Sequence, residues 1–211
     1  MIAIVDYGMG NLRSVQKGFE KVGFNAEITD APALIEQASG VVLPGVGAFK
    51  DCYEGLVERR LDGLVKEIAV SGRPFLGICV GLQLLFDYGE EGAGSPGLGI
   101  LPGRVQRFAD ARVTGLKVPH MGWNQLNPVP GRDHTLLKGI AEKPYAYFVH
   151  SYHAVPDNDE IVLARCHYGV DFPAMVGRGR LFAVQFHPEK SQADGIAMLR
   201  NFGELTAAAA E

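Results

Sequence analysis

The chain has 211 residues, of which 47% are hydrophobic, so it can bury one substantial core but is short for two enzyme domains. We therefore expect a single domain over residues 1–211. The net charge is -4 and no segment gathers Lys and Arg, so nucleic acid is not an expected partner. The N-terminus turns acidic too early for a signal peptide and no apolar run reaches about 18 residues, so we expect a cytoplasmic protein without membrane contact.

The three cysteines are Cys52, Cys79 and Cys166, which are far apart and lack CxxC spacing. This pattern argues against a disulfide framework and against a thiolate zinc site. No metal and no cofactor is predicted. If one of these cysteines has a functional role, we expect that role to depend on its reactivity.

In the first half, short Val- and Ile-rich runs alternate with longer segments of helical period. The expected strands are 2–5, 24–29, 40–44 and 74–78, and the expected helices are 12–22, about 51–70 and a short run at 82–86. This alternation is typical of a parallel sheet covered by helices.

From about residue 100 to 185 the pattern changes to strands joined by turns that contain Gly and Pro, with little helix between them. That half is predicted to be antiparallel or mixed. A helix at about 193–205 follows, and the alanines after it are expected to fray. The predicted fold class is α/β, with a mostly parallel central sheet flanked by helices and an antiparallel or mixed extension.

The strongest local signal is Gly77-Ile78-Cys79-Val80-Gly81, which follows a buried strand and precedes a helical run. In a nucleophile elbow the nucleophile adopts a strained backbone conformation that tolerates only small neighbours, so glycine at both flanks has a steric reason. A helix N-terminus also favours a thiolate. A buried structural cysteine is the alternative. That alternative is retained for Cys52 and Cys166, whereas Cys79 is predicted to be a nucleophile.

A thiol nucleophile needs a base, and His187-Pro188-Glu189 follows the apolar run LFAVQF. Residues two apart in an extended chain project to the same side, so Glu189 can hold the His187 imidazole in one tautomer. His187 would then take the thiol proton and later protonate the leaving amine. The alternative is a surface histidine at a strand end.

Acyl transfer also needs hydrogen-bond donors for the developing oxyanion. The main-chain amides of Val46, in the glycine-rich segment 44–49, and of Val80 are the candidates. That segment lacks the Lys-Ser/Thr of a phosphate-binding loop, and no nucleotide site is inferred.

Together, the segment 77–83 and His187-Pro188-Glu189 resemble the class I glutamine amidotransferases, whose triad is Cys, His and Glu on an α/β sheet. The segments 6–12, 44–49, 119–124 and 147–152 further resemble the glutaminase subunits of imidazole glycerol phosphate synthases. The resemblance runs nearly end to end.

This resemblance implies hydrolysis of L-glutamine through a thioester on Cys79. The ammonia would pass to a separate cyclase subunit with a (β/α)₈-barrel fold, in a heterodimer that makes imidazole glycerol phosphate and an aminoimidazole carboxamide ribotide for histidine biosynthesis. By the same resemblance, glutamine would be bound by Gly45, Gly47, Gln83, His150, Ser151 and Tyr152, and the cyclase would be contacted by Asn11, Trp123 and Lys190.

Some interpretations stay open. Trp123 could equally be a buried core residue or an anchor at a protein interface, since tryptophan is enriched in both. His120, His134, His153 and His167 lack ligand spacing and are expected to be structural or solvated, and His153 stands where the family pattern favours an aromatic residue. The chain could instead serve another synthase, such as an anthranilate- or guanylate-type enzyme, which the co-purifying partner would reveal. A stand-alone cysteine hydrolase would turn over without a partner, and a silent binding module would not need the intact triad.

Overall fold

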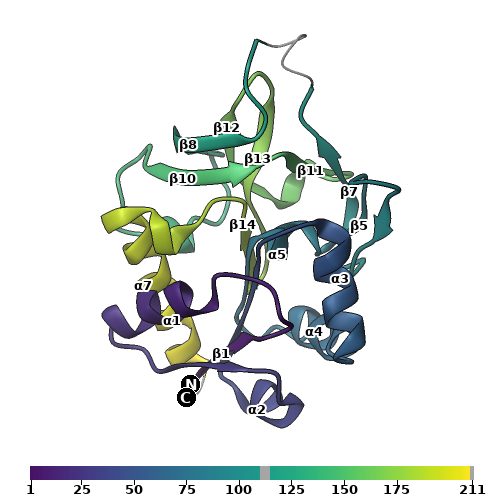
Figure 1. Ribbon diagram of the computed structural model, residues 1–211. Helices are drawn as coiled ribbons and strands as arrows, with labels where there is room; N and C mark the ends of the chain where they lie inside the picture. Colours follow the sequence, from purple (N-terminus) through teal and green to yellow (C-terminus); the bar gives the residue numbers. More distant parts are fainter. Residues whose placement is uncertain (110–114, 210–211) are drawn as a thin grey trace.

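The computed structural model describes residues 1–109 and 115–209 (Figure 1). The helices are α1 Leu12–Lys21, α2 Pro32–Gln37, α3 Phe49–Glu58, α4 Asp62–Val70, α5 Val80–Gln83 and α7 Gln192–Ala208. The strands of the largest sheet are β1 Ile2–Val5, β2 Ala26–Thr29, β3 Gly40–Gly45, β4 Phe75–Cys79, β9 Asn127–Pro128, β12 Val162–His167, β13 Asp171–Arg178 and β14 Leu181–Val184. The other strands are β5 Phe86–Gly89, β6 Ser95–Pro96, β7 Leu101–Arg107, β8 His120–Gln125, β10 Tyr145–His150 and β11 Tyr152–Pro156.

The largest sheet has the strand order β2-β1-β3-β4-β14-β13-β12-β9. Its first five strands are parallel, and the pairs β14/β13, β13/β12 and β12/β9 are antiparallel. The predicted parallel half and mixed half are thus confirmed, and they share one sheet. Strand β14 comes from the second half of the chain but lies parallel to β4, with Val184 opposite Ile78. The residues that follow β4 and β14 therefore meet at one edge of the sheet.

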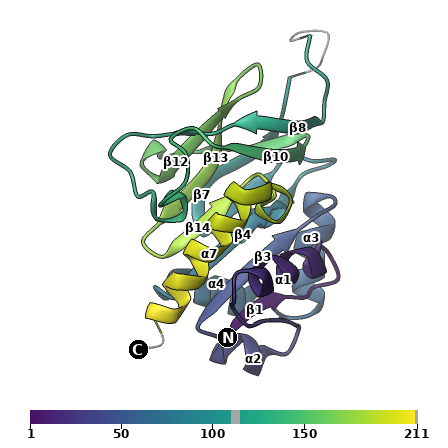
Figure 2. The ribbon, with the colours of Figure 1, turned by 90° about the vertical axis from the view of Figure 1, so that its left-hand side faces the viewer.

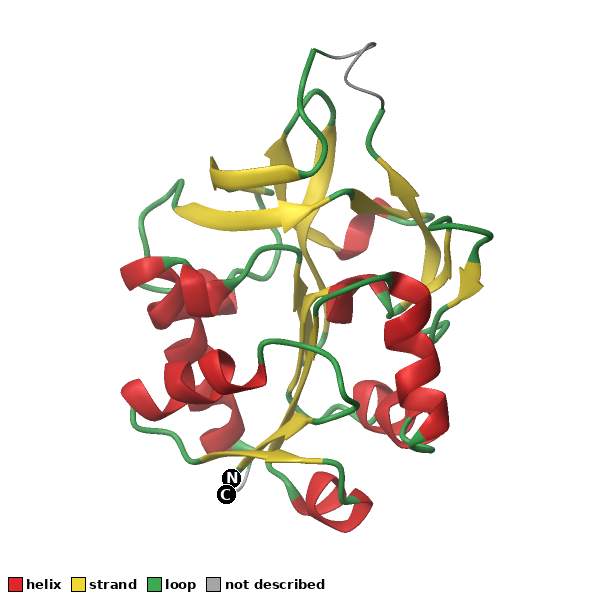
Figure 3. Cartoon of the chain, in the orientation of Figure 1, coloured by secondary structure: helices red, strands yellow, loops and turns green. Residues whose placement is uncertain are grey.

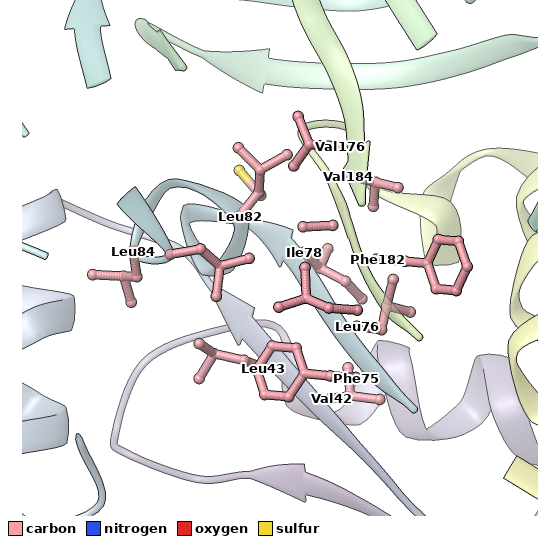
Figure 4. Close-up of a cluster of buried hydrophobic side chains, with 14 of the residues drawn as sticks. Val42, Leu43, Phe75, Leu76, Ile78, Leu82, Leu84, Val176, Phe182 and Val184 are labelled. Atoms are coloured by element: carbon pink, nitrogen blue, oxygen red, sulfur yellow. The ribbon is translucent and has the colours of Figure 1, made fainter. Parts of the chain in front are cut away.

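Helices cover both faces of this sheet. In Figures 1 and 3, α1 and α7 lie on one side and α3, α4 and α5 on the other, and Figure 2 shows α1 and α7 in front of the strands. The buried core between the layers is aliphatic and aromatic, and Figure 4 shows side chains of β3, β4 and β14 packed together, among them Val42, Leu76 and Phe182. A fully buried side chain of this size contributes about 1.5–3 kcal/mol. This packing holds the ends of β4 and β14 in place.

The expected helix at 51–70 is wrong as a single element, because α3 ends at Glu58 and α4 begins at Asp62. Arg60 has a φ of 58°, its N–H donates to Val57 O, and the Leu61 N–H donates to Leu56 O. These two bonds form a Schellman motif, which usually has glycine at the left-handed position. With arginine there, the sequence carries no visible helix stop.

The other predicted element boundaries differ less from those of the structure. The expected helical run at 82–86 is wrong, since α5 is one turn and Phe86 already belongs to β5. Helix α2 was not predicted. The closing helix was expected to end near residue 205, but α7 extends through Ala208, and only residues 210–211 of the C-terminal tail lie outside the described residues. Within the described residues, no helix combines the length and the hydropathy needed to cross a membrane.

Candidate active site

Cys79 is the last residue of β4 and has a φ of 56° and a ψ of -110°. Non-glycine residues rarely adopt a positive φ, and the strain persists only where the surrounding structure imposes it. A Cβ on Gly81 would overlap the main-chain oxygen of Leu43, and one on Gly77 would lie 2.9 Å from the oxygen of Gly81. The turn therefore requires glycine at both flanks, as a nucleophile elbow predicts.

His187 follows β14 and pairs with Glu189. The Nδ1 atom of His187 lies 2.8 Å from Oε1 of Glu189, and their side chains are 2% and 1% exposed. The pair forms through the 3-10 turn Pro188–Lys190, so the extended geometry expected for these residues is wrong, although the contact is present. Proline suits the first position of such a turn because its φ is already helical.

The electrostatics of this pair favour a charged imidazole. Burial lowers the pKa of His187, but its interactions with Cys79 and Glu189 outweigh burial and raise the pKa to about 9. Because Nδ1 faces Glu189, Nε2 is the nitrogen left for the thiol. Nε2 is buried and has no hydrogen-bond partner within residues 1–109 and 115–209. His187 is thus equipped to exchange a proton with a neighbouring sulfur.

Two glutamine side chains connect the elbow to the wall beside it. Nε2 of Gln83 donates to Oε1 of Gln185 at 3.0 Å, so Gln185 must direct its own Nε2 to Sγ of Cys79, at 3.7 Å. The amide donor of Gln185 thus faces the sulfur at the elbow. Gln185 follows the end of β14 and precedes His187 by two residues, but its contact with Cys79 spans 106 positions, so no local spacing indicates it.

A pocket of about 290 Å³ opens above Cys79. The predicted site residues that line it are Val46, Gly47, Cys79, Val80, Gln83, His150, Ser151, Tyr152 and His187. Glu189 and Gly45 do not line this pocket. Glu189 contacts His187, and Gly45 packs against the elbow, where an added Cβ would be 2.8 Å from Gly81 N. Asn11, Trp123 and Lys190 do not line the pocket.

The pocket also contains residues that the sequence did not single out, namely Glu91, Pro119 and Val149. The Glu91 carboxylate accepts the Phe49 N–H at 2.7 Å and is the carboxylate that lines this pocket. Nothing in the local sequence around Glu91 indicates this role. It arises from the way β5 and β6 fold beside α3.

The other cysteines and His153 have packing roles. Burial raises the pKa of the Cys52 thiol to about 11 and that of Cys166 to about 12, so both stay protonated and unreactive. His153 is buried, and its ring lies 4.7 Å from that of Phe108. It fills the place of the aromatic residue expected there.

Fold and site together define an α/β protein with a cysteine at a strained strand-to-helix turn and a buried His–Glu pair at the next strand end. Residues 3–205 match the family model described as Glutamine amidotransferase class-I. The chain belongs to this family of class I glutamine amidotransferases.

Several curated relatives that are about half identical to this chain are named imidazole glycerol phosphate synthase subunit HisH. The protein from Syntrophotalea carbinolica is 52% identical over 97% of this chain and 100% of its own length. The protein from Moorella thermoacetica is 51% identical over 97% of this chain and 94% of its own length.

Solved structures share the fold. A glutamine amidotransferase crystal structure matches with a TM-score of 0.75 at 21% identity, covering 98% of this chain and 100% of that chain. The structure of PurLQS from Thermotoga maritima matches with a TM-score of 0.72 at 20% identity, covering 100% of this chain and 98% of that chain.

Proposed function

We propose that this chain is the glutaminase subunit of an imidazole glycerol phosphate synthase and hydrolyses L-glutamine to glutamate and ammonia. The observation that carries the proposal is the pocket in which Cys79, at its strained elbow, lies beside His187 and its buried partner Glu189. The HisH relatives at about half identity over nearly the full chain support this assignment over another synthase.

In the proposed reaction, the thiol proton of Cys79 lies on Nε2 of His187, which agrees with the raised pKa of that imidazole, and Sγ attacks the side-chain amide carbon of glutamine as a thiolate. The tetrahedral intermediate collapses when His187 returns that proton to the nitrogen, which leaves as ammonia. A water molecule, deprotonated by His187, then attacks the thioester and releases glutamate. Glu189 keeps Nδ1 of His187 protonated through both steps.

The oxyanion formed in each step requires preorganised donors. The main-chain amides of Val80, directly after the nucleophile, and of Val46, directly after the neighbouring strand β3, are the proposed donors. Gly47 has a φ of 116°, a conformation that glycine adopts readily, so the 45–47 backbone can bend around a ligand.

Glutamine carries an ammonium and a carboxylate at its far end. The Glu91 carboxylate suits the ammonium, and the Gln83, Ser151 and Tyr152 segment supplies polar groups around it. His150 has both ring nitrogens within hydrogen-bond distance of protein atoms, so we assign its contribution to its backbone and its position in the wall.

The proposed partner is a cyclase subunit with a (β/α)₈-barrel fold, in a heterodimer. Strand β8 exposes Met121 and Trp123, which are 66% and 46% accessible, and the Trp123 ring lies edge-on to Tyr147 at 6.0 Å. Exposed aromatic residues of this kind mark protein interfaces. Asn11 precedes α1 without a capping hydrogen bond, and Lys190 is exposed, so both side chains are available to the partner.

The function is tested by measuring glutamate release from glutamine, with the chain alone and with the cyclase plus its nucleotide ligand. We expect stimulation of about 5–150-fold, the usual range of coupling between two sites. High turnover without any partner would indicate a stand-alone hydrolase. If only an anthranilate- or guanylate-type synthase stimulated the chain, its function would be assigned to that pathway.

Trp123→Ala is expected to weaken cyclase binding at least about 30-fold, because a buried aromatic anchor typically contributes about 2 kcal/mol or more. Titration calorimetry with the isolated cyclase measures this loss. Tyr88→Ala is the matched control, since Tyr88 is a similarly exposed aromatic side chain on another sheet, at 43%. Equal affinities of the two variants would exclude Trp123 from the interface.

A further inference from the structure

His150 lines the pocket, and it is paired with a second histidine that does not. His120 on β8 and His150 on β10 face each other across the antiparallel ribbon, and Nδ1 of His120 lies 2.9 Å from Nε2 of His150. Both side chains are buried. Along β8, residues 120 and 124 alternate with the exposed Met121 and Trp123, so the ribbon has an inner histidine face and an outer aromatic face.

The hydrogen bonds at the two ends of this pair determine its tautomers. Oδ1 of Asn124 accepts the Gln125 N–H at 2.8 Å, so Nδ2 of Asn124 is a donor towards Nε2 of His120 at 3.2 Å. Nε2 of His120 must therefore be an acceptor, which leaves the ring proton on Nδ1, facing His150.

The other end leads to the same assignment independently. Nδ1 of His150 lies 2.8 Å from the main-chain oxygen of Tyr152, which can only accept, so His150 carries its proton on Nδ1. Nε2 of His150 is then free to accept from His120. Burial lowers the pKa of His150 to about 3 and that of His120 to about 4, so both rings are neutral near pH 7.

The hydrogen-bond network continues from the Tyr152 carbonyl, which accepts from both sides, to the nucleophile. The Tyr152 oxygen also accepts from Nε2 of Gln83 at 3.0 Å, Gln83 donates to Gln185, and Gln185 reaches Sγ of Cys79. Gln83 and Tyr152 both line the pocket. A change in the His120–His150 pair therefore alters two groups that would contact glutamine.

We propose that His120 and Asn124 are positioning residues for glutamine: they hold His150 in its Nδ1–H tautomer and thereby fix the Tyr152 carbonyl and the Gln83 amide at the pocket wall. Neither residue lines the pocket itself. The inference rests on the proposed glutaminase function for its kinetic consequence, whereas the tautomers are a property of the resting protein.

The first test is ¹⁵N NMR of the full chain with labelled histidine, assigned by single-histidine variants. His120 and His150 are both expected in the neutral Nδ1–H form at pH 7. Finding either ring protonated on Nε2 would overturn the proposal. This readout needs no glutamine turnover, so it separates a failure of the hydrogen-bond chain from a failure of the proposed function.

The second test compares His120→Phe, His120→Asn and His167→Phe in the cyclase complex. Phenylalanine suits the aromatic surroundings of His120, whose ring stacks on Phe148 at 4.8 Å, but it removes the donor to His150. We expect the KM for glutamine to rise about fivefold to tenfold in His120→Phe, the cost of one lost hydrogen bond, with kcat reduced less than about threefold.

Asparagine places an amide donor near the position of Nδ1, so His120→Asn is expected to recover most of the wild-type KM. His167→Phe makes the same chemical change at an exposed ring that pairs with Asp171, and it keeps the main-chain oxygen that accepts from Asn124, so it is expected to leave KM unchanged. If a substitution only reduced the fraction of folded protein, kcat would fall and KM would stay unchanged. That result, or equal KM values for all three variants, would contradict a positioning role.

Discussion

The Cys79→Ala variant is expected to release no glutamate above background, a fall of about 10⁴–10⁶-fold in kcat, the range seen when a covalent nucleophile is deleted. The elbow presents a single sulfur to the pocket, and neither Cys52 nor Cys166 lines it. Glutamate release in the cyclase complex measures the loss.

Cys166→Ala is the matched control, because it makes the same change at a buried thiol on β12 and should keep full activity. The Cys79→Ala complex should also still use added ammonia in place of glutamine, which shows that partner and fold are intact. Residual glutaminase activity above about one per cent would mean that Cys79 is not the nucleophile.

Glu189→Gln is expected to lower kcat by about 10²–10⁴-fold. Glutamine preserves the shape of the side chain but removes the carboxylate that faces Nδ1 of His187 at 2.8 Å, so the imidazole loses its preferred tautomer and the stabilisation of its charged form. Glu204→Gln, at an exposed position of α7, is the control and should be neutral.

The pH dependence gives a second readout of the same pair. The pKa of His187 is raised to about 9, so the imidazolium that protonates the leaving amine should persist to that pH, and kcat/KM should fall on the alkaline side with an apparent pKa near 9. In Glu189→Gln the alkaline limb should move to lower pH. An unchanged alkaline limb of the kcat/KM profile would mean that a group other than His187 titrates near pH 9.

The sign of the stability effect follows from the same shift. A histidine whose folded pKa lies above its unfolded value of about 6.5 stabilises the fold fully below pH 6.5, and that contribution is lost as the pH rises through about 9. The midpoint temperature of thermal unfolding of the wild type should therefore fall between pH 7 and 10. Glu189→Gln should flatten this dependence.

The strands of the parallel half were predictable because each is a short apolar run buried on both faces. The expected strand 2–5 is confirmed residue for residue, and 40–44 and 74–78 are each within one residue of the observed bounds. The break between α3 and α4 was missed, since its stop depends on two main-chain hydrogen bonds and on an arginine in a conformation that usually requires glycine.

Among the site residues, the elbow and the His–Glu pair could be predicted from the sequence, because their chemistry depends on neighbours within a few positions. Gln185, Glu91 and the His120–His150 pair were not, because each acquires its role from a residue between 30 and 106 positions away or from a pocket wall. No local spacing encodes such contacts.

The sequence by itself determined the fold class, the strained turn at Cys79 and the pairing of His187 with Glu189, because these follow from local periodicity, glycine sterics and short spacing. The tertiary structure decided that β14 inserts beside β4, which brings His187 to Cys79 across more than a hundred residues. It also decided the hydrogen-bond network that connects Asn124 with the sulfur of Cys79. Strand order and side-chain orientation depend on packing of the whole core, which no segment specifies alone.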